Sequence, residues 1–101
     1  MNRQQGKNTK TIRVLIYGRV QGVGFRFFVR RCAQQMNVGG WVRNRGDGSV
    51  EIQATGSDEE ISIFVARIEQ GPETSRVDSA EITELREVRA WEGFEIAPST
   101  W

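Results

Sequence analysis

The chain has 101 residues, the size of one domain, and its 38% hydrophobic and 27% charged residues are typical of a globular protein. It contains no histidine and a single cysteine, Cys32. These counts exclude intrachain disulfides, His-based zinc sites and the Ser-His-Asp and Cys-His nucleophile systems. Any catalysis must use arginine, lysine, carboxylates, amides, hydroxyls or the backbone.

The first residues of the chain are polar. Residues 1–10 show no hydrophobic period, which predicts a flexible arm. They lack the apolar stretch of a secretory signal, and no apolar run elsewhere approaches the roughly 20 residues of a membrane-spanning helix. We therefore expect a cytoplasmic protein that does not bind membranes.

Charge is divided unevenly along the chain. Residues 11–49 hold seven arginines and one acid, Asp47, whereas residues 50–101 hold twelve acids and four arginines. An arginine-rich half that lacks acids is suited to holding an anion. Solvated faces that happen to segregate would give the same counts, so this alternative stays open.

Hydrophobic spacing changes once in the first third of the chain. Thr11–Tyr17 alternates in polarity, which predicts a strand, and the glycine-punctuated stretch Gly18–Gly24 predicts a loop. Phe25–Met36 places its apolar residues three and four positions apart, which predicts a helix. Gly39-Gly40 is expected to end that helix.

A hairpin and a second helix follow. Trp41–Arg45 and Ser49–Ala54 are predicted strands, joined by a turn at Gly46–Gly48. Ser57 stands three residues before Glu60, the spacing of a capping box, and predicts the start of the second helix.

The C-terminal third predicts two more strands. Val77–Val88 is expected to form the fourth strand, and Gly93–Ala97 a short fifth one. The order is then βαββαβ with a short strand at the end. It predicts an α+β, ferredoxin-like sandwich in which two helices cover one face of an antiparallel four-stranded sheet.

In this topology the third strand lies between the first two, so the C-terminal ends of the first and second strands share one edge. The loop 18–24 leaves the first strand at that edge, and Asn44 lies at the end of the second. The loop's glycines allow its backbone amides to turn inward as a nest for a tetrahedral anion. The N-terminus of the following helix adds positive potential.

Arg26 is placed to complete such a site. It lies in the first turn of the predicted helix, where its planar guanidinium can bind a phosphate with two hydrogen bonds. An ordinary glycine-rich turn beside a solvated arginine is the alternative. The lack of a nearby carboxylate and the convergence of Asn44 favour the anion site.

Other phosphate and nucleophile motifs do not fit. The loop has neither the spacing nor the Lys-Ser/Thr of a Walker motif. A cysteine-dependent phosphatase loop would need an arginine six residues after Cys32, where Val38 stands, so we interpret Cys32 as a core residue. Asp47 is predicted to be a turn residue, and Arg43 and Arg45 solvated surface charges.

Two stretches resemble the signature of the acylphosphatase family. Gly18–Arg26 reads Gly-Arg-Val-Gln-Gly-Val-Gly-Phe-Arg, and Gly40–Asn44 reads Gly-Trp-Val-Arg-Asn, followed by Asp47–Glu51. The length, the element order and the ending Gly93–Ile96 also match. The resemblance covers residues 11–97.

The resemblance implies metal-independent hydrolysis of acyl phosphates to a carboxylate and inorganic phosphate, without a cofactor. In the family the loop amides and the arginine hold the phosphoryl group, here Gly18, Arg19, Val20, Gln21, Gly22, Val23, Gly24 and Arg26. The asparagine, here Asn44, positions the attacking water. We expect a monomer with a small-molecule substrate. The tail Pro98–Trp101 lies outside the pattern and receives no role.

Two other functions fit parts of the sequence. The same element order occurs in readers of single-stranded RNA, whose aromatic-basic motif is resembled by Phe25, Phe27 and Phe28 beside Arg26 and Arg30. Here, however, the aromatics follow the loop with helical spacing. The second rival is a non-catalytic anion module, such as the acylphosphatase-like part of larger carbamoyl-phosphate-handling maturation proteins. Hydrolysis of an acyl phosphate separates the enzyme from that module.

Overall fold

The computed structural model describes residues 9–101, so residues 1–8 of the predicted arm lie outside the described part of the chain. The elements follow the predicted order: β1 (Thr9–Arg19), α2 (Phe25–Gln35), β2 (Gly39–Asn44), β3 (Val50–Ser57), α3 (Asp58–Gln70), β4 (Arg76–Glu84) and β5 (Phe94–Ile96).

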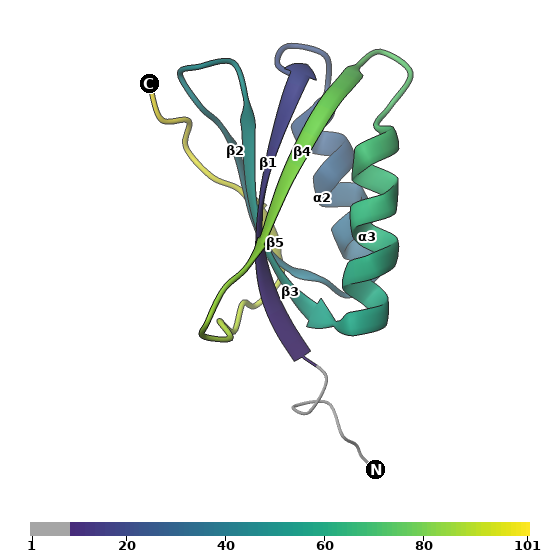
Figure 1. Cartoon of the computed structure of the whole chain (residues 1–101), viewed down its shortest axis with the longest axis vertical. Coiled ribbons are helices and arrows are strands. Elements are labelled where there is room, and N and C mark those ends of the chain that lie inside the picture. Colours follow the sequence, from purple (N-terminus) through teal and green to yellow (C-terminus); the bar gives the residue numbers. More distant parts are fainter. Residues whose placement is uncertain (1–8) are drawn as a thin grey trace.

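The strands form one sheet in the order β4-β1-β3-β2-β5. The first four pair antiparallel, and the short β5 runs parallel to β2 at the edge. Both helices cover the same face of the sheet (Figure 1). The predicted ferredoxin-like α+β fold and the position of β3 between β1 and β2 are therefore confirmed.

The core lies between the sheet and the two helices. The apolar residues of β1 and β3 that face the helices are buried, and they meet the buried stripes of α2 and α3: Ile12, Val14, Ile16, Val50, Ile52, Ala54, Phe25, Val29, Ala33, Ile61, Phe64 and Ile68. Cys32 belongs to this core, as predicted, and its burial raises the pKa of the thiol. A protonated, enclosed thiol is a poor nucleophile.

The first strand is longer than predicted at both ends. Thr9 and Lys10 pair with the end of β3, so these two residues of the predicted arm belong to the sheet. Gly18 and Arg19, predicted to be in the loop, pair with β4 beyond a bulge. Gly18 has φ 135°, and a Cβ there would lie 2.1 Å from the carbonyl oxygen of Arg76, so only glycine allows this close pairing.

Other boundaries also differ from the prediction, and β3 runs to Ser57 instead of Ala54. Asn37, with φ 57°, provides the left-handed residue after α2, while Gly39 and Gly40 already belong to β2. The fourth strand ends at Glu84 instead of Val88. Because β4 is an edge strand with mostly exposed side chains, its polarity pattern does not show where the strand ends.

Helix α3 begins with the predicted capping box. The Glu60 amide donates to Ser57 Oγ (3.0 Å), and the Ser57 amide donates to Glu60 Oε1 (2.9 Å). Asp58, Glu59 and Glu60 place negative charge in the first turn. This helix end is therefore satisfied by its own side chains.

The face of the sheet opposite the helices carries a compact ion cluster around Glu51. Its side chain is only 6% exposed and accepts from Arg13 Nε (2.8 Å) and Arg43 Nε (2.9 Å). Burial alone would raise the pKa of this carboxyl, but the hydrogen bonds from the two arginines outweigh it, and the pKa lies below its ordinary value. Arg43, predicted to be a solvated surface charge, is instead held in this cluster, and its Cζ also lies 4.7 Å from the centre of the Trp41 ring.

We predict that Glu51→Gln lowers the free energy of unfolding at neutral pH by about 1–2 kcal/mol, because charge-assisted hydrogen bonds to partly exposed arginines are lost. Since the folded pKa is depressed, the stabilisation is fully present above the unfolded pKa, ~4.3, and disappears as the pH falls through the folded value. Urea unfolding of both proteins between neutral and acid pH measures this. A difference that is independent of pH would contradict it.

Candidate functional site

The predicted loop and Asn44 lie at the same end of the sheet. Ile16 near the end of β1 and Asn44 at the end of β2 both pair with Val50, the first residue of β3. The chain leaves β1 into the loop 20–24 and leaves β2 into the hairpin turn at the same end of the molecule (Figure 1). The topology thus places the loop beside Asn44.

The loop leads into a helix end that lacks a side-chain cap. Gly24 is the N-cap of α2, with φ 81°, and makes no side-chain capping bond. No acidic residue lies in the first turn of α2, in contrast to α3. Val20 anchors the loop to the core, being 1% exposed. The first amides of α2 are therefore available to an anion.

Arg26 has its guanidinium free of protein partners. It lies in the first turn of α2, is half-buried, and makes no side-chain hydrogen bond or ion pair within residues 9–101. A hollow of about 230 Å³ lies beside it, lined by Val20, Gly22, Gly24, Phe25, Arg26 and Phe27. An unpaired arginine beside such a hollow is suited to binding an anion.

Asn44 is buried at the end of β2, with 7% of its surface exposed. It lies on the same face of the sheet as Val42, two positions before it, which is the face covered by the helices. Its Oδ1 is buried and has no hydrogen-bond partner in the described part of the chain. A buried amide oxygen without a partner is costly unless a small polar molecule binds it.

Gln21 links the loop to the hairpin turn. Its Nε2 donates to the carbonyl oxygens of Arg45 (2.8 Å) and Ser49 (2.9 Å). Sequence reasoning included Gln21 in the phosphate-binding loop but missed this bond. A polar side chain between two apolar or small residues indicated that Gln21 makes a specific contact. Its partners could not be predicted, because backbone carbonyls occur in every residue.

The hairpin turn holds Asp47 in a structural arrangement. Its Oδ1 accepts from the Ser49 amide (3.0 Å) and the Ser49 hydroxyl (2.5 Å), and these hydrogen bonds lower the pKa of the carboxyl. Arg45 Nη2 lies 3.9 Å from Asp47 Oδ2. The predicted turn role of Asp47 agrees with these contacts.

The C-terminal tail runs beside β2 up to the site. The Ala97 amide donates to the Val42 carbonyl (2.8 Å), and the Thr100 amide donates to the Asn44 carbonyl (3.0 Å). The tail 98–101 was given no role from the sequence. In the structure it supports the backbone of Asn44.

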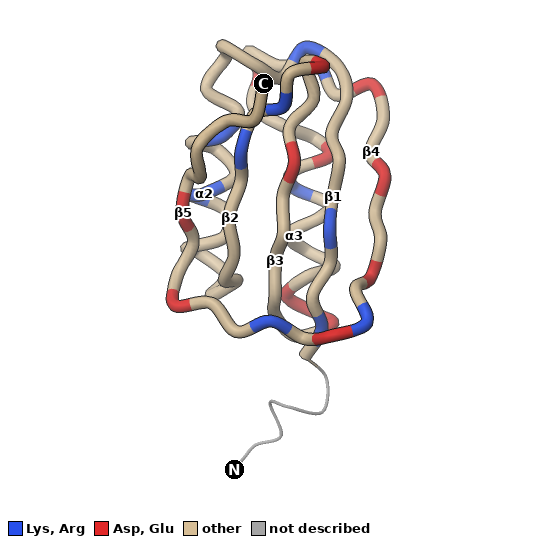
Figure 2. The backbone as a smooth tube through the Cα atoms, turned by 90° about the vertical axis from the view of Figure 1, so that its left-hand side faces the viewer, with Lys and Arg blue, Asp and Glu red and all other residues tan. Residues whose placement is uncertain are grey.

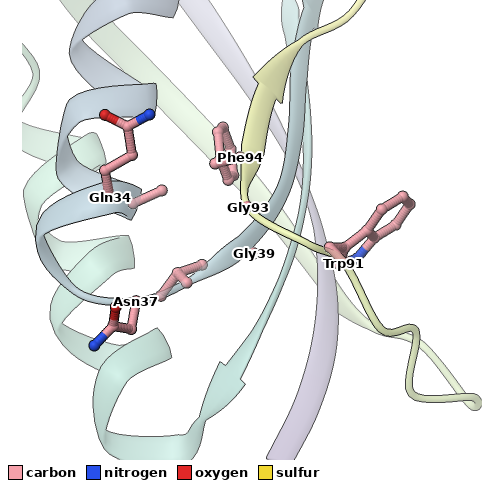
Figure 3. Close-up of a pocket in the computed structure, with 8 residues that line it drawn as sticks. Gln34, Asn37, Gly39, Trp91, Gly93 and Phe94 are labelled. Carbon is pink, nitrogen blue, oxygen red and sulfur yellow. The ribbon is translucent and has the colours of Figure 1, made fainter.

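A second hollow, of about 260 Å³, lies between the C-terminal end of α2 and β5 (Figure 3). Gln34 and Asn37 line one side, and the Trp91 ring points away from the helix. Gln34 lies eight residues after Arg26, roughly 12 Å along the helix axis. No predicted site residue lines this hollow.

Within residues 9–101, no group of three or more cysteine, aspartate or glutamate side chains is arranged to hold a metal ion. No helix in the same range is long and apolar enough to cross a membrane. The arrangement offers amides, one guanidinium and one carboxamide, which together can hold an oxyanion and a water molecule.

Comparison with known proteins identifies the family. The acylphosphatase family model matches residues 12–96. The chain belongs to the acylphosphatase family. It is 41% identical over 95 residues to an acylphosphatase of Koribacter versatilis (strain Ellin345), covering 94% of this chain and 86% of the relative.

Solved structures of similar proteins show the same fold. The crystal structure of acylphosphatase from Bacillus subtilis is 40% identical, with a TM-score of 0.83, and the match covers 86% of this chain and 97% of that one. Full-length HypF in the phosphate- and nucleotide-bound form matches with 33% identity and a TM-score of 0.89, covering 99% of this chain but 13% of HypF.

The predicted activity is confirmed by this membership. As an acylphosphatase, the enzyme hydrolyses acyl phosphates to a carboxylate and inorganic phosphate. The substrate is a small molecule, and phosphate is a product.

We predict that two glycines at this acylphosphatase site respond differently to alanine. Gly24→Ala should cost about 1–2 kcal/mol of stability, the strain of holding alanine in the left-handed conformation. The added Cβ meets nothing within 4 Å, so no clash adds to this cost. Gly18→Ala should cost more, because its Cβ would also clash with backbone at 2.1 Å. Thermal and urea unfolding measure both, and equal losses would contradict the role of Gly18 in the strand pair.

Proposed function

We propose that this enzyme binds the phosphoryl group with loop amides and Arg26 and positions the attacking water with Asn44, without a metal ion. Gly18 and Arg19 are part of the β1–β4 ladder, so the amides of Val20–Gly24 and of the first turn of α2 carry most of the binding. The buried, unpartnered Oδ1 of Asn44 at the same edge as the uncapped helix end is the observation that carries the proposal.

The chemistry needs little more than this arrangement. A carboxylate is a good leaving group, so the enzyme must stabilise charge on the phosphoryl oxygens and place a water in line with the bond that breaks. Asn44 Oδ1 accepts a hydrogen bond from that water. As the water oxygen bonds to phosphorus, the bond from phosphorus to the acyl oxygen breaks and its electron pair leaves with the carboxylate. The water's proton passes to a phosphate oxygen.

The contacts of the site support a mechanism without a general base. Asp47 is the acid closest in sequence to the site residues, and its carboxylate is held by Ser49. Arg26 supplies a fixed positive charge where a metal ion would otherwise be needed to neutralise the phosphoryl oxygens.

We further propose a cytoplasmic monomer that acts on a small-molecule acyl phosphate and binds neither nucleic acid nor membranes. Its catalytic domain comprises the predicted residues 11–97 together with Thr9 and Lys10, which pair with β3. Phe25, Phe27 and Phe28 all lie on α2, and the Phe25 and Phe28 rings pack together at 6.2 Å. They are thus absent from the open face of the sheet, where stacking aromatics of RNA readers lie.

We predict that Arg26→Ala lowers kcat/KM by at least ~10²–10³-fold and also weakens inhibition by inorganic phosphate, because Arg26 holds both the ground state and the transition state. Arg31→Ala is the matched control, since Arg31 is exposed on the same helix. Hydrolysis of a simple acyl phosphate with EDTA present measures both. An Arg26→Ala enzyme with the kcat/KM of the wild type would refute the phosphate site. Full loss of wild-type activity in EDTA would refute metal independence.

Asn44→Ala should lower kcat by about 10²-fold while the inhibition constant for phosphate changes by less than about threefold, because the asparagine contacts the water and not the phosphoryl group. Steady-state kinetics with phosphate as inhibitor separate the two effects. If phosphate affinity falls as much as kcat does, the water-positioning role is wrong.

A further inference from the structure

Gln21 is the side chain that ties the two halves of the site together. The two carbonyls that accept from its Nε2, at 2.8 and 2.9 Å, lie 24 and 28 positions further along the chain. They belong to Arg45 and Ser49, the residues that begin and end the turn after Asn44. One carboxamide therefore spans from the phosphate loop to the strand end that carries Asn44.

The turn that receives these bonds is itself held firmly. The Arg45 amide donates to the Ser49 carbonyl (2.9 Å), and the Gly48 amide donates to the Arg45 carbonyl (3.1 Å). The Asn44 carbonyl is held by the Thr100 amide at 3.0 Å. Because the turn is fixed from several sides, the bonds from Gln21 set the position of the loop relative to Asn44.

The same bonds exclude the Gln21 side chain from phosphate binding. A carboxamide has two N–H donors, and here one NH₂ group serves two carbonyls. Its remaining polar atom, Oε1, is an acceptor and gains nothing from phosphate oxygens. The side chain thus acts on the geometry of the site and not on the ligand.

We propose that Gln21 is a positioning residue that sets the distance between the bound phosphorus and the water held by Asn44. This inference rests on the proposed function, in which the loop holds phosphorus and Asn44 holds water. An in-line displacement is sensitive to that distance, and a misplacement of about 1 Å costs about 10²-fold in rate. The Val20 side chain, 1% exposed, anchors the loop to the core independently of Gln21. We therefore expect the loop amides and Arg26 to keep their arrangement relative to one another, and phosphate binding not to depend on the Gln21 side chain.

Gln21→Met tests the proposal, because methionine keeps the length of the side chain and removes both donors. We expect kcat to fall about 10–100-fold, while the inhibition constant for phosphate changes by less than about threefold. Gln34→Met is the matched control, an exposed glutamine at the other end of α2. Unchanged kcat in Gln21→Met, or a loss of phosphate affinity as large as the loss in kcat, would overturn the proposal.

A double-mutant cycle with Asn44→Ala tests whether Gln21 acts through Asn44. If it does, Gln21→Met should change kcat by no more than about twofold once Asn44 is absent. Multiplicative losses would show that Gln21 acts elsewhere and would overturn the proposal. Failure of the proposed function would look different, because an unchanged kcat in the single variant Asn44→Ala would contradict the water-positioning role itself.

Gln21→Glu keeps the test decisive if the methionine variant does not fold. At neutral pH the introduced carboxylate faces two carbonyl oxygens without a proton to donate, whereas the protonated carboxyl donates one hydrogen bond. The kcat of this variant relative to wild type should therefore rise as the pH falls towards ~4.3, the ordinary pKa of a glutamate. A pH-independent ratio would overturn the proposal.

Discussion

The site exists because β3 is inserted between β1 and β2. Val50 pairs with Ile16 on one side and with Asn44 on the other, so two strand ends from distant parts of the chain lie two strand spacings apart. Everything else at the site follows from this register. A slip of one residue would turn Asn44 to the open face of the sheet and Val42 out of the core, so the apolar residues of the core also determine where Asn44 points.

The sequence predicted what depends on patterns that burial imposes. Alternation identified β1 and helical spacing identified α2, because each buries one face, and the capping-box spacing identified the start of α3. Element order alone predicted that the loop after β1 and Asn44 at the end of β2 lie at the same end of the sheet. Features that depend on the backbone could not be predicted from side-chain patterns. They are the pairing of Gly18 with β4, the left-handed conformation of Asn37 after α2, and the carbonyl oxygens that accept hydrogen bonds from Gln21 Nε2. Every residue has a backbone carbonyl, so a hydrogen bond to one does not require a particular amino acid at that position.

Several arginines are held in ion pairs, whereas Arg26 has no acidic partner within residues 9–101. Arg13 and Arg43 bind Glu51, and Arg76 binds Asp78 at 2.9 Å. Acidic residues lie along β4, at the edge away from β2 (Figure 2). Helix α2 has no acid at any position. Arg26 is therefore kept from neutralisation by placing the carboxylates on other elements.

The two helix starts show how the fold combines stability with a binding site. Helix α3 begins with the Ser57–Glu60 capping box and has three acids in its first turn, whereas α2 begins at a glycine and has neither feature. A side-chain cap on α2 would add about 1 kcal/mol of stability, but its oxygen would occupy the amides that an anion needs. The start of α2 is held by other means: the Val20 side chain in the core, and the Gln21 bonds to the turn. Because these contacts use the side chains of the loop, its backbone amides remain available to an anion. The loop can thus be rigid without filling its own anion site.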